Sequence, residues 1–155
     1  MRWYLYLPGC SGPLKPVVVD ATEFSSQFPA SSVLVLGERD ERATSQKFNF
    51  WLAQSNKTEG QGFTIKLDTC ARMIAGCQIK NKGAGSHPHR ATKSFRVSGT
   101  LNEKGPWQTL VEDELADTTG GFPAALLNFT FEKPVEIQFM KFDLISFWGK
   151  GGGLQ

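Results

Sequence analysis

The stretch at residues 62–68, which reads GFTIKLD, is the clearest indication of the fold. Its large apolar residues Phe63, Ile65 and Leu67 alternate with polar ones. Successive side chains of a β-strand point to opposite faces, so strict alternation is typical of a strand with one face in a core and one in water. The stretch therefore predicts a half-buried β-strand with these three apolar side chains turned inward.

Similar short apolar runs recur on both sides of this stretch, separated by turn-forming residues. They lie at residues 3–7, 17–19, 33–36, 48–53, 63–67, 74–79, 94–97, 107–111, 126–131 and 135–147. Many short strands punctuated by turns are typical of a β-sandwich or a β-barrel. Evidence for helix is thin: Phe24 and Phe28, one helical turn apart, allow a short helix within residues 20–29. In the last run the apolar phase changes near Phe139 and Met140, which predicts a bulge or burial on both faces.

The composition is that of an ordinary globular chain. It has 155 residues, 40% of them hydrophobic and 21% charged, and a net charge of +2. One domain spanning residues 1–155 is expected from this length. The small charge and the lack of a basic cluster argue against nucleic acid as a partner. We find no run long enough to span a membrane and no secretory signal.

The chain has three cysteines, Cys10, Cys70 and Cys77, so at least one of them is unpaired within the chain. A bridge between Cys70 and Cys77 is possible, but the same spacing also suits two reduced thiols in a core. Zinc sites use closely spaced cysteine pairs, and none is present.

Three long loops lie between the expected strands, at residues 37–47, 83–91 and 113–125. The second loop holds both histidines of the chain, His87 and His89. Long loops in compact domains commonly carry function, so these three are the candidate binding loops.

The order of motifs resembles the discoidin-like, coagulation-factor type C domains of the galactose-binding-like superfamily. The similar pieces read GFTIKLD, IAGCQIKN, RATKSFRV, GPWQTL, VEIQFMKFD and FWGKGGGLQ, and with WLA they extend from Trp51 to Gln155. The resemblance implies an all-β, jelly-roll β-sandwich with about eight core strands and with ligand-binding loops at one end. It also favours an extracellular location.

The loop at residues 83–91 offers ligand contacts, since imidazole and guanidinium groups donate hydrogen bonds to hydroxyl or carboxylate oxygens. A solvated turn is the alternative. We expect His89 and Arg90 to contribute little to folding, since a polar loop with glycines buries little apolar area. The residues that we expect to bind the ligand, some from this loop and some from the other two, are His87, His89, Arg90, Phe122, Asp117 and Arg42. Neither a nucleophile nor an orienting carboxylate accompanies the histidines in the sequence, so no catalytic residue is assigned.

The charged segment within residues 37–47 can be read in two ways. Glu38, Asp40 and Glu41 could supply oxygen ligands to Ca²⁺, which takes six to eight of them. Alternatively, the segment is a solvated loop of mixed charge whose ion pairs contribute little. Calcium is thus the one cofactor that the sequence leaves open.

Aromatic residues and glycosylation sequons add further expectations. Trp51 and Trp107 match core positions of the related domains and are expected to pack inside. For Trp148 the sequence does not decide between packing in the core and stacking on a sugar ring. Two sequons for N-glycosylation begin at Asn56 and Asn128. Asn128 falls in an expected strand and should be the less accessible of the two.

The sequence as a whole indicates a non-catalytic module that binds a carbohydrate or glycoconjugate, on a glycan or glycoprotein, in adhesion or recognition. The alternatives are a protein-interaction module, which could be intracellular, and a module that binds a phospholipid surface. Few basic residues accompany the apolar Phe122, so a membrane surface is the less favoured of these.

Overall fold

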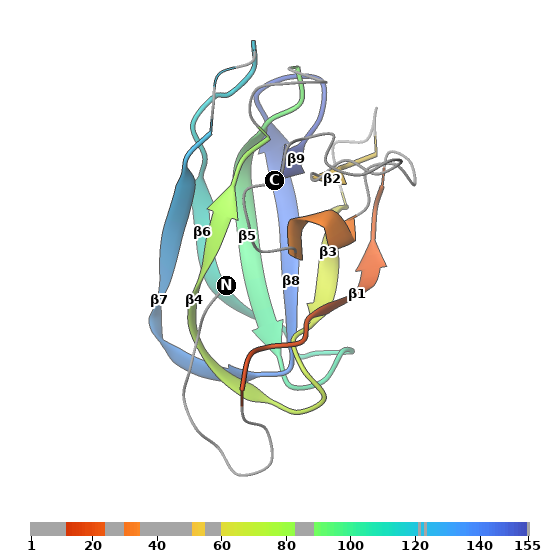
Figure 1. The fold of residues 1–155 in the computed structure, drawn as a ribbon, viewed down its shortest axis with the longest axis vertical. Helices are drawn as coiled ribbons and strands as arrows, with labels where there is room; N and C mark the ends of the chain where they lie inside the picture. Colours follow the sequence, from red (N-terminus) through yellow and green to blue (C-terminus); the bar gives the residue numbers. More distant parts are fainter. Residues whose placement is uncertain are drawn as a thin grey trace.

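The computed structural model describes residues 12–23, 30–34, 51–54, 60–82, 89–120, 122 and 124–154. Among these residues the chain forms antiparallel sheets and one 3₁₀ helix (Figure 1). The larger sheet has five strands in the order β1-β3-β8-β5-β6. Its strands are β1 (Val17–Ala21), β3 (Gln61–Lys66), β8 (Phe139–Phe147), β5 (Thr92–Thr100) and β6 (Gln108–Glu114).

Two smaller sheets complete the described architecture. Strand β4 (Arg72–Lys80) pairs with β7 (Leu126–Ile137), and the short β2 (Trp51–Leu52) pairs with β9 (Gly153–Leu154). Figure 1 shows β4 and β7 alongside the large sheet, so the molecule has the two layers of a β-sandwich. The expectation of an all-β sandwich is confirmed.

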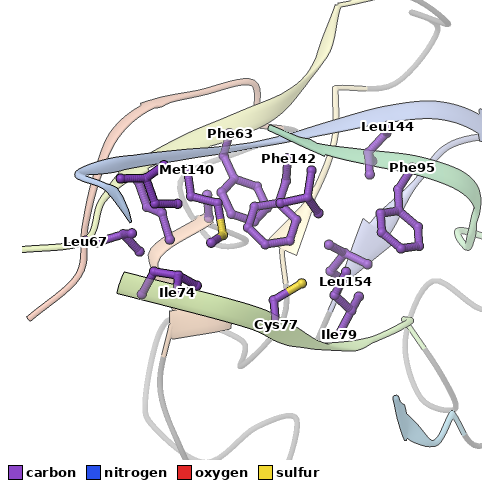
Figure 2. Close-up of a cluster of buried hydrophobic side chains, with 14 of the residues drawn as sticks. Phe63, Leu67, Ile74, Cys77, Ile79, Phe95, Met140, Phe142, Leu144 and Leu154 are labelled. Atoms are coloured by element: carbon purple, nitrogen blue, oxygen red, sulfur yellow. The ribbon is translucent and has the colours of Figure 1, made fainter. Parts of the chain in front are cut away.

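The core lies between the two layers. The prediction for β3 holds in part, because Phe63 and Ile65, with Leu67 just beyond the strand, are all buried. The predicted water-facing side is wrong, since Gln61 and Thr64 are buried as well. Figure 2 shows side chains of β3, β5 and β8 facing Ile74 and Cys77 of β4. Two aromatic contacts tie the core together. One stacks the rings of Phe63 and Phe142, and the other sets Phe95 edge-to-face against Phe129, each with centroids 4.9 Å apart.

One sequence expectation about an element is corrected. The apolar run at residues 33–36 was expected to be a strand, but residues 33 and 34 close the 3₁₀ helix η1 (Ala30–Leu34). The helix begins where the carboxylate Oε1 of Glu23 accepts a hydrogen bond from the backbone N–H of Ala30 at 2.9 Å. That long-range cap satisfies an N–H group that a helix start leaves open, and periodicity could not predict it.

The change of apolar phase near the chain's last long run has a simple cause. Strand β7 continues to Ile137, and a bend at Gln138 separates it from β8, which begins at Phe139. The side-chain amide of Gln138 donates to the carbonyl oxygen of Thr69 at 3.0 Å, which ties the bend to the end of β3. The phase therefore changes because two antiparallel strands of different sheets meet there.

The cysteines do not form the bridge that the sequence allowed. Cys70 is disulfide-bonded, whereas Cys77 is a free, buried thiol. The only other cysteine of the sequence is Cys10, which lies outside the described residues. Burial raises the pKa of the Cys77 thiol from its ordinary value of 9.0 to about 12. Within the described part of the chain, no helix is both long and apolar enough to cross a membrane.

Candidate functional site

The antiparallel order of the strands brings several loops to one end of the sandwich. Strands β4, β6 and β8 finish at this end, and β5 and β7 start there, at the top of Figure 1. The described residues that follow or precede these strand ends are 81–82, 89–91, 115–120, 122, 124–125 and 148–152. We call this set the loop end. It includes parts of two of the three loops singled out in the sequence.

Asn81 is the buried hub beneath the loop end. Its amide nitrogen donates to the carbonyl oxygens of Thr92, at 2.9 Å, and Ala116, at 3.0 Å. Its amide oxygen accepts from the backbone N–H groups of Lys82 and Thr92, both at 3.0 Å. Since the side chain is only 4% exposed, these bonds are shielded from water. One residue thus holds the end of β4, the start of β5 and the chain after β6 together.

A second layer of bonds extends this hub to the C-terminal segment. The hydroxyl of Thr118 donates to the carbonyl oxygen of Lys82, and the hydroxyl of Thr92 donates to that of Gly153 at 3.1 Å. Lys82 itself is fully buried. Polar side chains in such positions need partners, so these contacts fix the base on which the exposed loops stand.

Arg90 belongs to this buried layer and not to the surface. It was expected to contact a ligand and to contribute little to folding, but the residue is 3% exposed and its guanidinium Nη2 donates to the carbonyl oxygen of Ala53. It forms a β-bridge with Gly151, where a Cβ atom would come within 2.9 Å of the guanidinium Nε. Burial lowers the pKa of the Arg90 guanidinium. The expectation of a small folding role is therefore wrong, because the guanidinium packs under the loops.

His89, next in the chain, is at the surface. It is exposed, and its carbonyl oxygen accepts a hydrogen bond of 3.0 Å from the backbone N–H of Lys150. A Cβ at position 149 would collide with the same carbonyl group, so the close approach of the two segments requires Gly149. The Cγ2 of Thr119 lies on the other side of that glycine. Three segments distant in sequence therefore meet around Gly149.

Trp148 is the exposed aromatic residue of the loop end. Its ring is held in place by a hydrogen bond of 2.8 Å from the indole Nε1 to the carbonyl oxygen of Leu115. The ammonium group of Lys93 lies 4.7 Å from the ring centroid, within the range of a cation–π contact. The residue is nevertheless 38% exposed. The sequence did not decide whether Trp148 is buried or exposed, and it did not predict the contact with Lys93. That contact forms because the start of β5 pairs with the end of β8.

The other predicted residues of the loop end are Asp117 and Phe122, and both are exposed. Asp117 Oδ1 accepts hydrogen bonds from the hydroxyl of Thr119, at 2.6 Å, and from its backbone N–H, at 2.8 Å. Those bonds lower the pKa of the Asp117 carboxyl, so it is ionised at neutral pH. Phe122 is 65% exposed, which agrees with the expected apolar tip.

Several predicted residues cannot be placed. His87, Arg42, Glu38, Asp40 and Glu41 lie outside the described residues. Among the residues that are described, no group of three or more His, Cys, Asp or Glu side chains could hold a metal ion.

Of the two tryptophans expected in the core, only Trp107 has a described side chain. Trp51 lies in β2, and its side chain is outside the described part of the structure. Trp107 is half-buried, with the ammonium of Lys141 5.6 Å from its ring centroid. Its position follows the turn at Gly105 and Pro106, at the end of the sandwich opposite the loop end. A core role for Trp107 is therefore wrong, since it covers the outer side of β8.

Comparison with known proteins finds solved structures that share the fold of this chain. No family model and no curated protein sequence matches the chain. A family 32 carbohydrate-binding module of C. perfringens NanJ, in complex with galactose, is 15% identical with a TM-score of 0.63 over 91% of this chain and 88% of that one. The chain has the fold of these modules. They are discoidin-like, so the resemblance seen in the sequence is confirmed at the level of the fold.

Two further solved structures show the range of proteins with this fold. Chitosan-binding module 2 of a chitosanase/glucanase from Paenibacillus sp. IK-5, in complex with chitotriose, is 12% identical with a TM-score of 0.59, covering 91% of each chain. Allantoicase is 17% identical with a TM-score of 0.60, over 90% of this chain but 38% of its own. Most of the similar structures are binding modules, but the fold alone does not decide between binding and catalysis.

Proposed function

We propose that this chain is a non-catalytic module that binds a carbohydrate or glycoconjugate at the loop end. The observation that carries the proposal is the meeting of His89, Thr119 and Trp148 around Gly149, anchored by the hydrogen bond from Lys150 to His89. This meeting brings an exposed imidazole and an exposed indole from two segments to one surface, together with the half-buried Thr119 from a third. The likeness in fold to modules solved with galactose and with chitotriose supports the same use.

The chemistry of these side chains suits a sugar. The apolar C–H face of a sugar ring packs well against an aromatic ring, and Trp148 presents one that is held in a fixed orientation. The imidazole of His89 and the carboxylate of Asp117 can bond to hydroxyl groups around the ring. Asp117 keeps acceptor capacity for this, since its two hydrogen bonds from Thr119 use only Oδ1.

Binding at such a surface should be weak for a single sugar. The ligand would lie on exposed residues, and few contacts offset the loss of its freedom on binding. Dissociation constants near the millimolar range, about −4 kcal/mol, are expected for a monosaccharide. Several modules or several sugars acting together would raise the apparent affinity.

A glycan array probed with the full chain tests the proposal, with two variants as a matched pair. His89→Ala removes a surface contact and should weaken binding to any glycan found by about tenfold, which is about 1.4 kcal/mol. Lys133→Ala removes another exposed side chain, on β7, and binding should stay as in the unaltered chain. Equal binding by the two variants would place the ligand elsewhere, and an array without any bound glycan would contradict the proposal.

Glycan binding in this proposal does not depend on calcium, for which Glu38, Asp40 and Glu41 are the candidate ligands. Repeating the array and a thermal unfolding curve with EDTA tests the idea. We expect nearly unchanged stability, whereas a fall of several degrees would reveal a bound ion that stabilises the folded state.

The second candidate function is docking to a protein partner or to a phospholipid surface. The observation that favours it is a set of exposed apolar residues before and at the start of β7, where Phe122, Leu126 and Leu127 are 65%, 56% and 38% exposed. Co-sedimentation with phospholipid vesicles separates the lipid reading from the glycan reading. In this candidate function, substitution of Phe122 and not of His89 would abolish binding.

A further inference from the structure

The sequon at Asn128-Phe129-Thr130 lies near the start of β7 and has a geometry that the sequence did not predict. The residue was expected to be poorly accessible because it lies in a strand. The strand is confirmed, but both Asn128 and Thr130 are exposed. Phe129 between them turns inward and packs edge-to-face against Phe95 of the opposite sheet. Alternation along the strand therefore presents the two essential sequon residues on one outer face.

The surroundings of Asn128 leave its reactive atom toward solvent. The amide oxygen accepts a hydrogen bond of 2.7 Å from the Nε2 of Gln78, which is also exposed, on the neighbouring strand β4. That bond fixes the orientation of the amide and uses its oxygen. Among the described residues, no hydrogen bond from the amide nitrogen of Asn128 is found. The nitrogen is the atom to which an N-linked glycan is joined.

We propose that Asn128 is an N-glycosylation site of this protein. The donor would be an oligosaccharide linked to a lipid pyrophosphate, and the acceptor the Asn128 amide. A bond forms between Nδ2 and the first sugar carbon, the bond from that carbon to the pyrophosphate oxygen breaks, and one proton passes from the nitrogen to water or to the departing pyrophosphate. The lipid pyrophosphate is the leaving group, and nothing is oxidised or reduced.

Two independent features agree with this modification. Cys70 is disulfide-bonded, and disulfides persist in the oxidising compartments where N-glycosylation also takes place. In addition, Leu126, two residues before Asn128 on the same face of β7, is 56% exposed. A glycan on Asn128 would lie beside this apolar side chain. Bulky, soluble groups of this kind keep exposed strands from pairing with other chains.

The test is to pass the full chain through a eukaryotic secretory pathway behind a cleavable signal. Peptides are then analysed by mass spectrometry from both the retained and the released protein. We expect a glycan on the Asn128 peptide, removable by peptide-N-glycosidase with conversion of Asn128 to aspartate. Asn128→Gln should lose this glycan completely while any glycan at Asn56 stays.

A pair of variants at Thr130 controls for changes in folding. Thr130→Ser keeps a sequon and should keep the glycan, whereas Thr130→Ala destroys the sequon and should lose it, with Asn128 and its contact to Gln78 unchanged. An unmodified Asn128 peptide in the unaltered chain would overturn the proposal. A glycan that survives Thr130→Ala would overturn it equally.

Discussion

At the scale of single residues, the buried side chain of Asn81 connects three segments at the loop end. Its four hydrogen bonds satisfy backbone groups of three segments beneath the proposed site. Without this side chain, those buried groups would have no partner from Asn81. Nothing in the sequence around Asn81 signals this role. An asparagine at the end of a predicted strand is usually read as a turn residue, and only the return of β5 and β6 to the same end reveals its partners.

Asn81→Ala should therefore destabilise the protein by about 2–4 kcal/mol, since it leaves several buried backbone groups without partners. Asn102→Ala is the matched control, because Asn102 is exposed and its side chain accepts one bond, from the N–H of Lys104. That change should cost about 1 kcal/mol or less. Urea unfolding curves give both values, and equal costs for the two variants would show that the hub is not needed.

Cys77 provides a prediction about pH at the same scale. The buried thiol keeps its proton in the folded state up to a pKa of about 12, whereas in the unfolded chain it ionises near 9.0. Between these values the unfolded state binds fewer protons, so the free energy of unfolding must fall as pH rises. The stability that this thiol contributes is fully present below pH 9.0. Above that pH the free energy of unfolding falls by up to about 1.4 kcal/mol per pH unit.

Unfolding curves across this pH interval check the thiol's contribution. Cys77→Ala should lose less stability than the unaltered chain over the same interval, although it is less stable at neutral pH because of the cavity it creates. The native thiol should also resist alkylation at pH 8 and react once the chain is unfolded. Rapid alkylation of the native protein would contradict its burial.

At the scale of elements, the end of the sandwich opposite the loop end is fastened by the pair Asp68 and Arg72, between β3 and β4. Arg72 Nη1 donates to Asp68 Oδ2 at 2.6 Å, and its Nη2 donates to the carbonyl oxygen of Gly12 at 2.7 Å. The backbone N–H of Thr69 and the Arg72 guanidinium lower the pKa of the Asp68 carboxyl. Stability from this carboxylate is thus present above its ordinary pKa of 3.8 and lost as pH falls through the lowered value.

Arg72→Ala breaks a buried ion pair and should cost about 3 kcal/mol. Arg96→Ala breaks an exposed pair with Glu112, 2.8 Å apart, and should change stability little because water already solvates both groups. Thermal and urea unfolding distinguish the two. The folded fraction of Arg72→Ala should still bind glycan, and a loss of binding there would show that the two ends of the sandwich are coupled.

The strands were predictable from the sequence where large apolar side chains alternate with polar ones. Alternation located β3, β5 and the start of β7 because each turns a row of apolar side chains inward, although it did not predict that the other face of β3 is buried too. The 3₁₀ helix η1 was not predictable, since its first N–H is satisfied by Glu23 from outside the helix. Local periodicity carries no information about such distant partners.

The candidate site was predictable only as a set of loops. The sequence indicated His89, Asp117 and Phe122, and these are exposed at the loop end. It assigned Arg90 to the surface, because a charged residue beside a glycine-rich loop is normally solvated. The glycines that follow Trp148 instead leave room for the guanidinium to pack beneath the loops. Residue types were thus informative, but burial depended on a contact between segments 61 residues apart, Arg90 and Gly151.

At the scale of the whole molecule, the two ends of the sandwich have different chemistry. One end is closed by buried bonds among Asp68, Arg72 and Gly12, and the other exposes His89 and Trp148 on a buried polar base. Rigid sandwiches with function on their end loops are a recurrent design in β proteins. Buried polar bonds therefore stabilise both ends, and we propose that only the loop end recognises a sugar.

An NMR titration of the isotopically labelled chain with galactose, and in parallel with chitotriose, tests this assignment most directly. Amide signals of His89, Thr119 and Lys150 and the indole Nε1–H signal of Trp148 should move with sugar concentration, while those of Thr69 and Arg72 stay in place. Signals that move only at the Arg72 end, or that do not move with either sugar, would contradict the account.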